Sequence, residues 1–294
     1  MAKARAIHKR RRAVRNIRKI TRTMQLIATS KYQQSLNRAT AGRPYANGIA
    51  DLVQKIAAAA GEHAEHPLLH VNRDAGRGAI LLLTSNRGLC GGYNALLLRA
   101  AQARLRTGDG DGSETDLHVV GKKGVNHFTF LRRAMAQKYT KVGDTPRFAD
   151  IEPIAEGFIE DYQARRVDWI DIVYMKFVSA GRQEPTCARL LPFHPMPAAD
   201  PAAEPEGPAV AFDFTPPAAE LLRELLPAAV KATVYQYFLD AMVSENVARM
   251  VAMKAATDAA GDMIRSLSRQ FNRARQTQIT MELLDIVGGA AAIS

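Results

Sequence analysis

Phosphate binding is the first chemistry that the sequence raises, in the stretch Gly88-Leu-Cys-Gly-Gly92 after a short apolar run. A glycine-rich loop that follows a strand can hold phosphate with its backbone N–H groups. This stretch lacks the Lys-Ser/Thr pair of a P-loop and the full spacing of a dinucleotide-binding turn. We therefore predict a tight backbone turn here, and a similar basic turn at Gly121-Lys-Lys-Gly124.

Metal binding and nucleophilic catalysis have little support. His63, His66 and His70 are spaced for one helical face, but Pro67 interrupts it, so loop histidines are predicted rather than a metal site. Cys90 is expected to be buried, and no His–acid pair argues that it is a nucleophile. With only two cysteines, a disulfide scaffold and a four-cysteine zinc site are excluded. The sequence predicts no catalytic residue, no cofactor and no metal.

The elements around the glycine-rich stretch alternate between strand and helix. Buried strands are predicted at 79–84, 117–120 and 167–177, and helices at 95–105 and 154–165. This alternation predicts a small Rossmann-like α/β domain over residues 75–195. A polar surface loop is expected at 107–116. Seven of the 14 prolines lie in 195–217, which predicts a proline-rich linker at 196–217.

The N-terminal segment, residues 1–60, is predicted to be a long helix. Its apolar residues recur at spacings of three and four, which is the helical period. They are Ala13, Ile17, Ile20, Met24 and Ile27, with Val14 and Leu26 widening the stripe. Pro44 and Gly48 predict a kink or a break in this helix.

The C-terminal segment, residues 218–294, is also predicted to be helical. Its apolar stripe continues without a break for 70 residues, roughly 105 Å of helix. The second half of the stripe is Ala248, Val251, Ala255, Ala259, Met263, Leu267, Phe271, Ala274, Met281 and Leu284. A helix of this length needs a partner, and the N-terminal helix is the one available. The predicted fold is α+β, with a long antiparallel coiled coil of the two terminal helices beside the α/β domain.

The charge is concentrated at the N-terminus. Residues 1–50 contain 13 Lys or Arg and no acid precedes Asp51, whereas the remaining residues carry 27 basic and 29 acidic side chains. Such a block can bind nucleic acid, anionic lipid or an acidic protein surface. A transit peptide is disfavoured because the helical pattern continues well past residue 36. Nucleic-acid binding stays an alternative, although no aromatic residue before Tyr32 offers a stacking platform. A Rossmann-like enzyme with helical arms is a third possibility.

Three collinear stretches resemble the gamma subunit of F-type ATP synthase over nearly the whole chain. They are Lys19-Ile-Thr-Arg-Thr-Met24 with Ala28-Thr-Ser-Lys31, Thr84-Ser-Asn-Arg-Gly-Leu-Cys-Gly-Gly-Tyr-Asn94, and Ala248–Asp258 with Asn272–Ala292. The resemblance implies a central rotor shaft that couples proton- or sodium-driven rotation of the c-ring to ATP synthesis or hydrolysis. It also implies a non-catalytic subunit without an active site of its own, peripheral on the cytoplasmic face of a bacterial inner membrane. The implied partners are the alpha and beta subunits, the epsilon subunit and the c-ring. Nucleic acid is not among them, and the membrane is reached only through the c-ring.

The resemblance also implies contact residues. Contact with the alpha–beta ring is expected at Lys19, which lies within the first stretch, and at Met24, which matches a methionine that faces that ring. The resemblance assigns further contacts with that ring to Arg249, Arg275, Gln276 and Thr280. Phe212 and Phe214 keep the aromatic spacing of a family segment that touches the c-ring, but they lack its hydroxyl groups and its glutamate. Contact with the c-ring or epsilon is therefore expected there, with its polar part in doubt.

Overall fold

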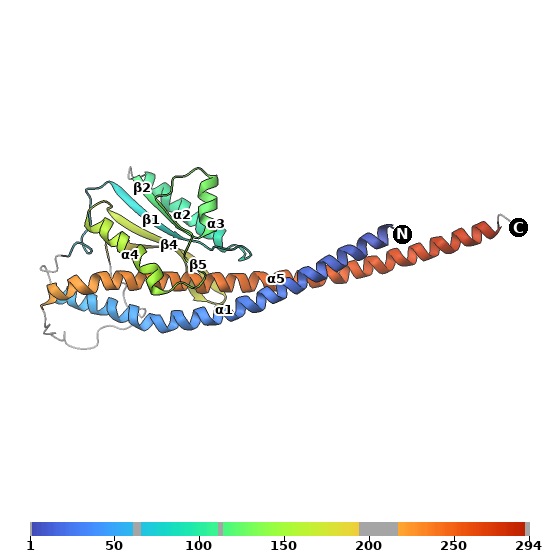
Figure 1. Cartoon of the computed structure of the whole chain (residues 1–294), viewed down its shortest axis with the longest axis horizontal. Coiled ribbons are helices and arrows are strands. Elements are labelled where there is room, and N and C mark those ends of the chain that lie inside the picture. Colours follow the sequence, from blue (N-terminus) through green and yellow to red (C-terminus); the bar gives the residue numbers. More distant parts are fainter. Residues whose placement is uncertain (1, 61–65, 111–113, 194–216, 292–294) are drawn as a thin grey trace. The chain divides into compact units, whose positions relative to one another are not determined.

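The computed structural model describes residues 2–60, 66–110, 114–193 and 217–291 (Figure 1). The elements are α1 (Ala2–Ala60), β1 (Arg77–Leu83), α2 (Tyr93–Gly110), β2 (Glu114–Val120), α3 (Lys122–Phe130), β3 (Gln137–Tyr139), α4 (Phe148–Gln163), β4 (Trp169–Ser179), β5 (Arg182–Leu191) and α5 (Ala218–Ala291). Two long terminal helices accompany a five-stranded sheet, so the predicted α+β class is confirmed. The predicted linker, with Phe212 and Phe214, lies outside the described residues except for Pro217.

The chain forms two compact units, which we describe separately. Residues 1–30 and 249–294 make up the helical unit, and residues 31–248 make up the sheet unit. This division cuts both terminal helices, whereas the sequence-based division kept each helix whole. Each unit therefore contains a part of α1 and a part of α5.

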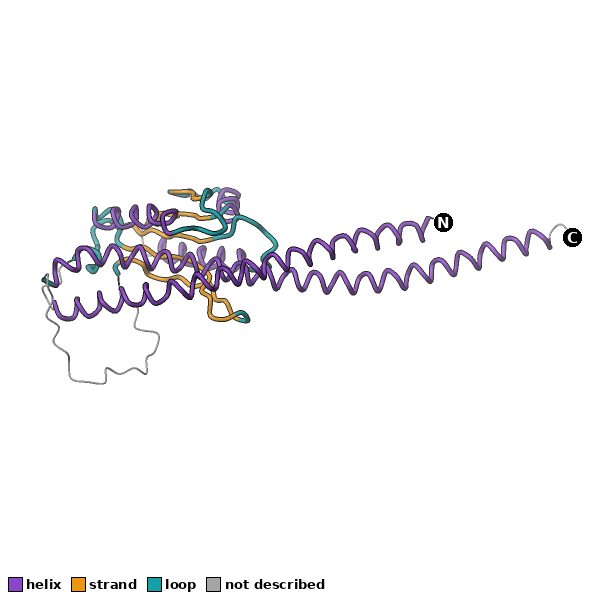
Figure 2. The backbone as a smooth tube through the Cα atoms, turned by 60° about the horizontal axis from the view of Figure 1, so that its bottom comes forward, coloured by secondary structure: helices purple, strands orange, loops and turns teal. Residues whose placement is uncertain are grey.

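In the helical unit the two helix segments run antiparallel, side by side in Figures 1 and 2. Low residue numbers of α1 meet high numbers of α5: Val14 packs with Ala260 and Leu267. Further along, the Thr257 hydroxyl donates to the Thr21 hydroxyl at 2.8 Å. The antiparallel pairing expected from the sequence is thus present in this unit.

The prediction of which residues lie in the seam, the contact surface between these two helices, is largely wrong. Ile17 and Ile20 are 52% and 59% exposed, and Leu26, Ile27 and Ala13 are exposed too. On α5, Val251, Ala255, Ala259 and Met263 are exposed, while Leu267 is buried and Phe271 and Ala274 are half-buried. The α1 seam instead follows a seven-residue repeat of Ile7, Val14, Thr21 and Ala28. Thr21 and Ala28 in the seam allow the helices to approach closely, whereas Ile17, Ile20 and Ile27 face outward.

The sheet unit is built on the strand order β3-β2-β1-β4-β5. β1 pairs in parallel with β2 and β4, and β5 is antiparallel to β4. Alternate residues of a strand point to opposite faces. Ile80 and Leu82 accordingly pack under α2 and α3. Ala79, Leu81 and Leu83 belong to the core with α4 and the sheet-unit parts of α1 and α5.

Several local predictions are corrected by the structure. α1 continues through Pro44 and Gly48 without a break, because Ile49, Val53 and Ile56 beyond them are held in the core of the sheet unit. The predicted turn at 121–124 instead begins α3. In place of the polar loop at 107–116, α2 extends to Gly110 and β2 starts at Glu114. β3 and β5 were not predicted, since both are edge strands with many exposed residues.

Candidate functional site

The six predicted ring contacts all lie in the helical unit. Lys19 and Met24 are on α1, and Arg249, Arg275, Gln276 and Thr280 are on α5. Arg249 and Thr280 are 31 residues apart on one helix, which corresponds to about 46 Å. The structure therefore does not join them into one site, but distributes them along the unit.

Lys19 and Met24 are the two predicted residues that the structure brings together. They line a shallow, open hollow of about 270 Å³ with Ile20 and Thr23. Lys19 is exposed and Met24 is half-buried. The hollow is almost entirely apolar at its surface apart from the lysine, so it suits an apolar side chain of a partner better than a polar ligand.

The other four contacts present polar groups along α5. Arg275 and Gln276 are exposed, and Arg249 is half-buried. Thr280 is exposed, and its hydroxyl donates to the Gln276 carbonyl oxygen at 3.0 Å. A guanidinium in such a position can bind a carboxylate through two parallel hydrogen bonds.

Sequence reasoning missed the outward apolar face of the helical unit. On α1 it comprises Ile17, Ile20, Leu26 and Ile27; on α5 it comprises Val251, Met263, Ile279, Met281, Leu283, Leu284, Ile286 and Val287. Exposed large apolar side chains in this number indicate a surface that contacts another protein. The seven-residue repeat on α1 (Ile7, Val14, Thr21 and Ala28) is the sequence signal that would have predicted which side of α1 faces α5.

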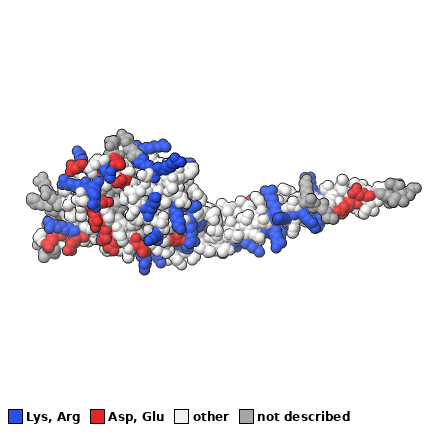
Figure 3. Space-filling view, turned by 45° about the horizontal axis from the view of Figure 1, so that its top comes forward, with Lys and Arg blue, Asp and Glu red and all other residues white. Residues whose placement is uncertain are grey.

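The helical unit is strongly cationic. It contains 16 of the 40 Lys and Arg residues and only four of the 29 acids, so the chain's net positive charge is concentrated here and the sheet unit is close to neutral. Lys and Arg side chains cover part of it in Figure 3. One cation is used internally, because the Arg11 guanidinium lies 4.9 Å from the centre of the Phe271 ring. An acidic partner surface would be attracted and oriented by this charge.

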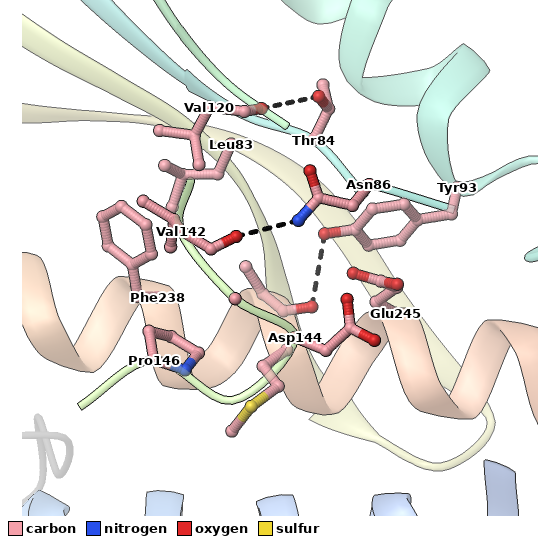
Figure 4. Close-up of a pocket in the computed structure, with 13 residues that line it drawn as sticks. Leu83, Thr84, Asn86, Tyr93, Val120, Val142, Asp144, Pro146, Phe238 and Glu245 are labelled. Atoms are coloured by element: carbon pink, nitrogen blue, oxygen red, sulfur yellow. Dashed lines mark hydrogen bonds between the residues drawn. The ribbon is translucent and has the colours of Figure 1, made fainter. Parts of the chain in front are cut away.

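In the sheet unit, a pocket lies at the carboxyl ends of β1 and β2 beside α5 (Figure 4). Its volume is about 50 Å³, room for a few waters. Asn86 Nδ2 donates to the Val142 carbonyl oxygen at 2.8 Å, and Asp144 pairs with Lys31 and Arg87, each at 3.4 Å. Small-molecule sites are usually several hundred Å³. A nucleotide does not fit this pocket, which argues against the Rossmann-like enzyme.

The glycine-rich stretch beside this pocket is a tight turn, as predicted. Leu89 and Gly91 have positive φ angles of 64° and 57°. Cys90 is buried and accepts a hydrogen bond from Asn94 Nδ2 at 3.2 Å, which ties the turn to the start of α2. No group of three or more potential metal ligands occurs among the described residues, which exclude His63.

His66 and His118 are the histidines of the sheet unit whose pKa the structure displaces. Burial lowers the pKa of His66, with smaller contributions from Arg223 and His70, and its Nδ1 accepts a hydrogen bond from the Leu68 N–H at 3.2 Å. Burial also lowers the pKa of His118, partly opposed by Asp116 and Asp161. The His118 ring packs edge-on against Phe158, and its buried Nδ1 has no hydrogen-bond partner among the described residues.

Acidification is therefore expected to destabilise the sheet unit through His118. Because the folded pKa lies below the unfolded value, the unfolded state binds more protons as the pH falls through the unfolded pKa, about 6.5. The free energy of unfolding of the sheet unit is therefore highest above that pH and decreases as the pH falls below it. We expect urea unfolding to show that the free energy of unfolding falls less between pH 7.5 and pH 5.5 in His118→Phe than in the unmodified chain. An unchanged pH dependence in the variant would contradict this role.

Comparison with known proteins decides the family. The family model described as ATP synthase matches residues 3–293. The ATP synthase gamma chain of Rhodopirellula baltica is 43% identical over 295 residues, covering 100% of this chain and 99% of the relative. The ATP synthase gamma chain of Frankia casuarinae is 40% identical, and the match covers 99% of this chain and 97% of the relative. This chain belongs to the ATP synthase gamma-chain family.

Solved structures agree with this family at the level of the fold. A chain of the Euglena gracilis mitochondrial ATP synthase, in an assembly of OSCP, F1 and c-ring, matches with a TM-score of 0.67 and 17% identity, covering 99% of this chain and 95% of that one. A chain of the Tetrahymena thermophila central stalk and c-ring matches with a TM-score of 0.59 and 20% identity, covering 81% and 99%. Among the described residues of this gamma chain, no helix has the length and apolar composition needed to cross a bilayer.

Proposed function

We propose that this gamma chain is the rotating central shaft of an F-type ATP synthase. It couples rotation of an ion-driven c-ring to ATP synthesis or hydrolysis in the ring of alpha and beta subunits. The observation that carries the proposal is the helical unit, in which Val14, Ala260 and Leu267 are packed between the helices while many other large apolar side chains and the cations face outward.

An outward apolar face suits a rotating contact. Apolar contacts are non-directional, so a surface of Ile, Leu and Met side chains can change partners without breaking a fixed set of hydrogen bonds. The flexible thioether of Met24 adapts to neighbours of different shape. Arg249, Arg275, Gln276 and Thr280 add a few directional contacts that we assign to the alpha–beta ring. Each position of the shaft then favours a different conformation of the surrounding subunits, which is an allosteric coupling.

Torque also requires that the sheet unit hold α5 firmly. Residues 237–244 of α5 are all buried, so the helix is enclosed on every side in this part. The Tyr93 hydroxyl donates to the Ala241 carbonyl oxygen at 3.2 Å, and the Ser244 hydroxyl donates to the Met175 carbonyl oxygen at 3.1 Å. Turning the helix within the sheet unit would break these bonds. α5 continues as one helix to Ala291, and we propose that it carries torque from the sheet unit.

The proposed partners are the alpha and beta subunits around the helical unit, and the epsilon subunit and c-ring at the sheet unit. The chain is then a peripheral subunit on the cytoplasmic face of a bacterial inner membrane, attached through the c-ring. Phe212 and Phe214 remain our assignment for the c-ring or epsilon contact. No observation favours the nucleic-acid alternative, and we do not retain it.

Reconstitution tests the function directly. The chain mixed with alpha and beta subunits should form a complex that hydrolyses ATP, and beads attached to the sheet unit should rotate. Failure to assemble with any bacterial alpha and beta subunits, combined with DNA affinity that falls steeply with salt, would overturn the proposal.

Arg249→Ala and Gln276→Ala are expected to slow ATP turnover of the reconstituted complex by a few-fold to about tenfold each. A lost charge-assisted hydrogen bond is worth about 1.5–3 kcal/mol, part of which is regained from water at these accessible positions. The melting temperature of the isolated chain should stay unchanged for Gln276→Ala, because that side chain is exposed. Ser266→Ala, a half-buried position on the same helix, is the control. If either variant abolishes assembly, the residue has a structural role.

A further inference from the structure

Two buried polar side chains link α1 to α5 inside the sheet unit. Ser35 on α1 is 3% exposed, and Asn246 on α5 is 6% exposed. Asn246 Nδ2 donates to Ser35 Oγ at 3.1 Å and to the Met242 carbonyl oxygen at 3.0 Å, so both of its protons are used. Ser35 Oγ in turn donates to the Lys31 carbonyl oxygen at 2.7 Å. The pair is therefore a satisfied polar network that joins helices from the two ends of the chain.

The apolar contacts beside this pair do little to fix the axial register, which is the position of one helix along the other. Ala39 of α1 packs against Leu239, Met242 and Val243 of α5. An added Cβ at Gly42 would lie 3.5 Å from Leu239 Cδ1, so the backbone of α1 comes close to α5 there. Ala39 and Gly42 are both small and lie three residues apart on α1. Sliding α1 by one turn would therefore exchange one small residue for another and keep the apolar contact.

The same slide would break the polar link. One turn moves Ser35 Oγ about 5 Å along the axis, out of hydrogen-bond reach of Asn246 Nδ2. One Nδ2 proton would then be buried without its acceptor, which is unfavourable. A single buried Asn is known to select one register between paired helices for this reason. The polar pair thus distinguishes registers that the apolar contacts do not.

We propose that Asn246 and Ser35 are positioning residues that hold α1 and α5 in a single axial register. The ring contacts that we assign lie on both helices, with Lys19 and Met24 on α1 and Arg249 on α5. A single register keeps these contacts in a fixed order along the shaft. That consequence rests on the proposed function, whereas the register itself is a property of the chain alone.

The distance between two spin labels on the isolated full-length chain tests the register. Gln34 on α1 and Glu224 on α5 are exposed, and Glu224 precedes Asn246 by 22 residues, about 33 Å of helix. A slide of α1 therefore changes the separation of the labels directly. The labels are attached to cysteines at these two positions after the exposed Cys187 is replaced by serine, and Cys90 is buried. Pulsed electron paramagnetic resonance should give one distance when the polar pair is intact.

Asn246→Leu is the decisive variant. Leucine has a similar volume and no polar group, so the melting temperature should be kept or raised. A second distance should appear, displaced by about 5 Å and populated by about a tenth of the molecules or more. Ser35→Ala, which removes only the acceptor, should give the same second distance. A merely structural role for Asn246 predicts the reverse, a lower melting temperature with one distance.

Ser244→Ala is the matched control. Ser244 is also fully buried on α5, but its hydroxyl donates to the Met175 carbonyl oxygen of β4 at 3.1 Å and not to α1. Its replacement should lower the melting temperature and leave the single distance unchanged.

Two results would overturn the inference: a single, unshifted distance in Asn246→Leu or in Ser35→Ala, and a second distance in Ser244→Ala. Both are measured on the chain without partners, so they do not depend on assembly. Failure to assemble with alpha and beta subunits would contradict the proposed function and leave the measured register as it is.

Discussion

Ile17→Ser with Ile20→Ser is expected to weaken binding of this gamma chain to the alpha–beta ring about 30-fold and to reduce ATP turnover of the complex accordingly. Both side chains are more than half exposed in the helical unit. Burying the rest of each against a partner is worth about 1 kcal/mol, and about 2 kcal/mol in total corresponds to roughly 30-fold in affinity. The melting temperature of the isolated chain should barely change, because neither residue lies in the seam.

Val14→Ser is the matched control for that experiment. Val14 is buried in the same helix and packs against Ala260 and Leu267. Its replacement should destabilise the helical unit, so that the circular dichroism signal of the helices is lost at a lower temperature than in the unmodified chain. The outcome that would refute our assignment of the two faces is the reverse pattern, in which Ile17 and Ile20 control the stability of the isolated chain and Val14 does not.

Gly121→Ala is expected to lower the stability of the sheet unit by about 3 kcal/mol or more. Gly121 has a φ of 91°, which side-chain-bearing residues rarely adopt, and an added Cβ would lie 2.2 Å from the Thr84 carbonyl oxygen. The clash is between Gly121, at the junction of β2 and α3, and the backbone just after β1, so no side-chain rotation relieves it. Urea unfolding of the variant should show a much lower midpoint.

Gly157→Ala provides the opposite result for comparison. Gly157 lies inside α4, and an added Cβ would meet nothing within 4 Å. Alanine there should stabilise the sheet unit by about 0.5–1 kcal/mol, since it lowers the entropy of the unfolded chain and favours the helix. Equal effects of the two substitutions would mean that the strained backbone at Gly121 has no energetic consequence.

The strand and helix predictions succeeded where the local pattern and the final environment agree. The apolar run at 79–84 became β1, and the β-branched and aromatic run at 167–177 became β4, because both are central strands buried on two faces. β3 and β5 escaped prediction because edge strands expose much of their length and carry no continuous apolar signal. Pro185 within β5 weakened its signal further.

The six ring contacts of the candidate site came from the resemblance, and the structure adds where they lie and which are accessible. Lys19 and Met24 are only five residues, about 1.4 turns, apart on α1, so the sequence already placed them near each other.

By itself, the sequence determined that both ends of the chain are long helices, that an α/β sheet lies between them, and that positive charge accumulates at the N-terminus. Only the tertiary structure decided which face of each helix is inward. Helical periodicity places Ile17, Ile20 and Ile27 on one stripe, but it does not say whether that stripe meets the partner helix or another protein. Packing resolved this in favour of Val14, Thr21 and Ala28, which lie against α5 residues such as Thr257, Ala260 and Leu267 and leave Ile17, Ile20 and Ile27 on the outside.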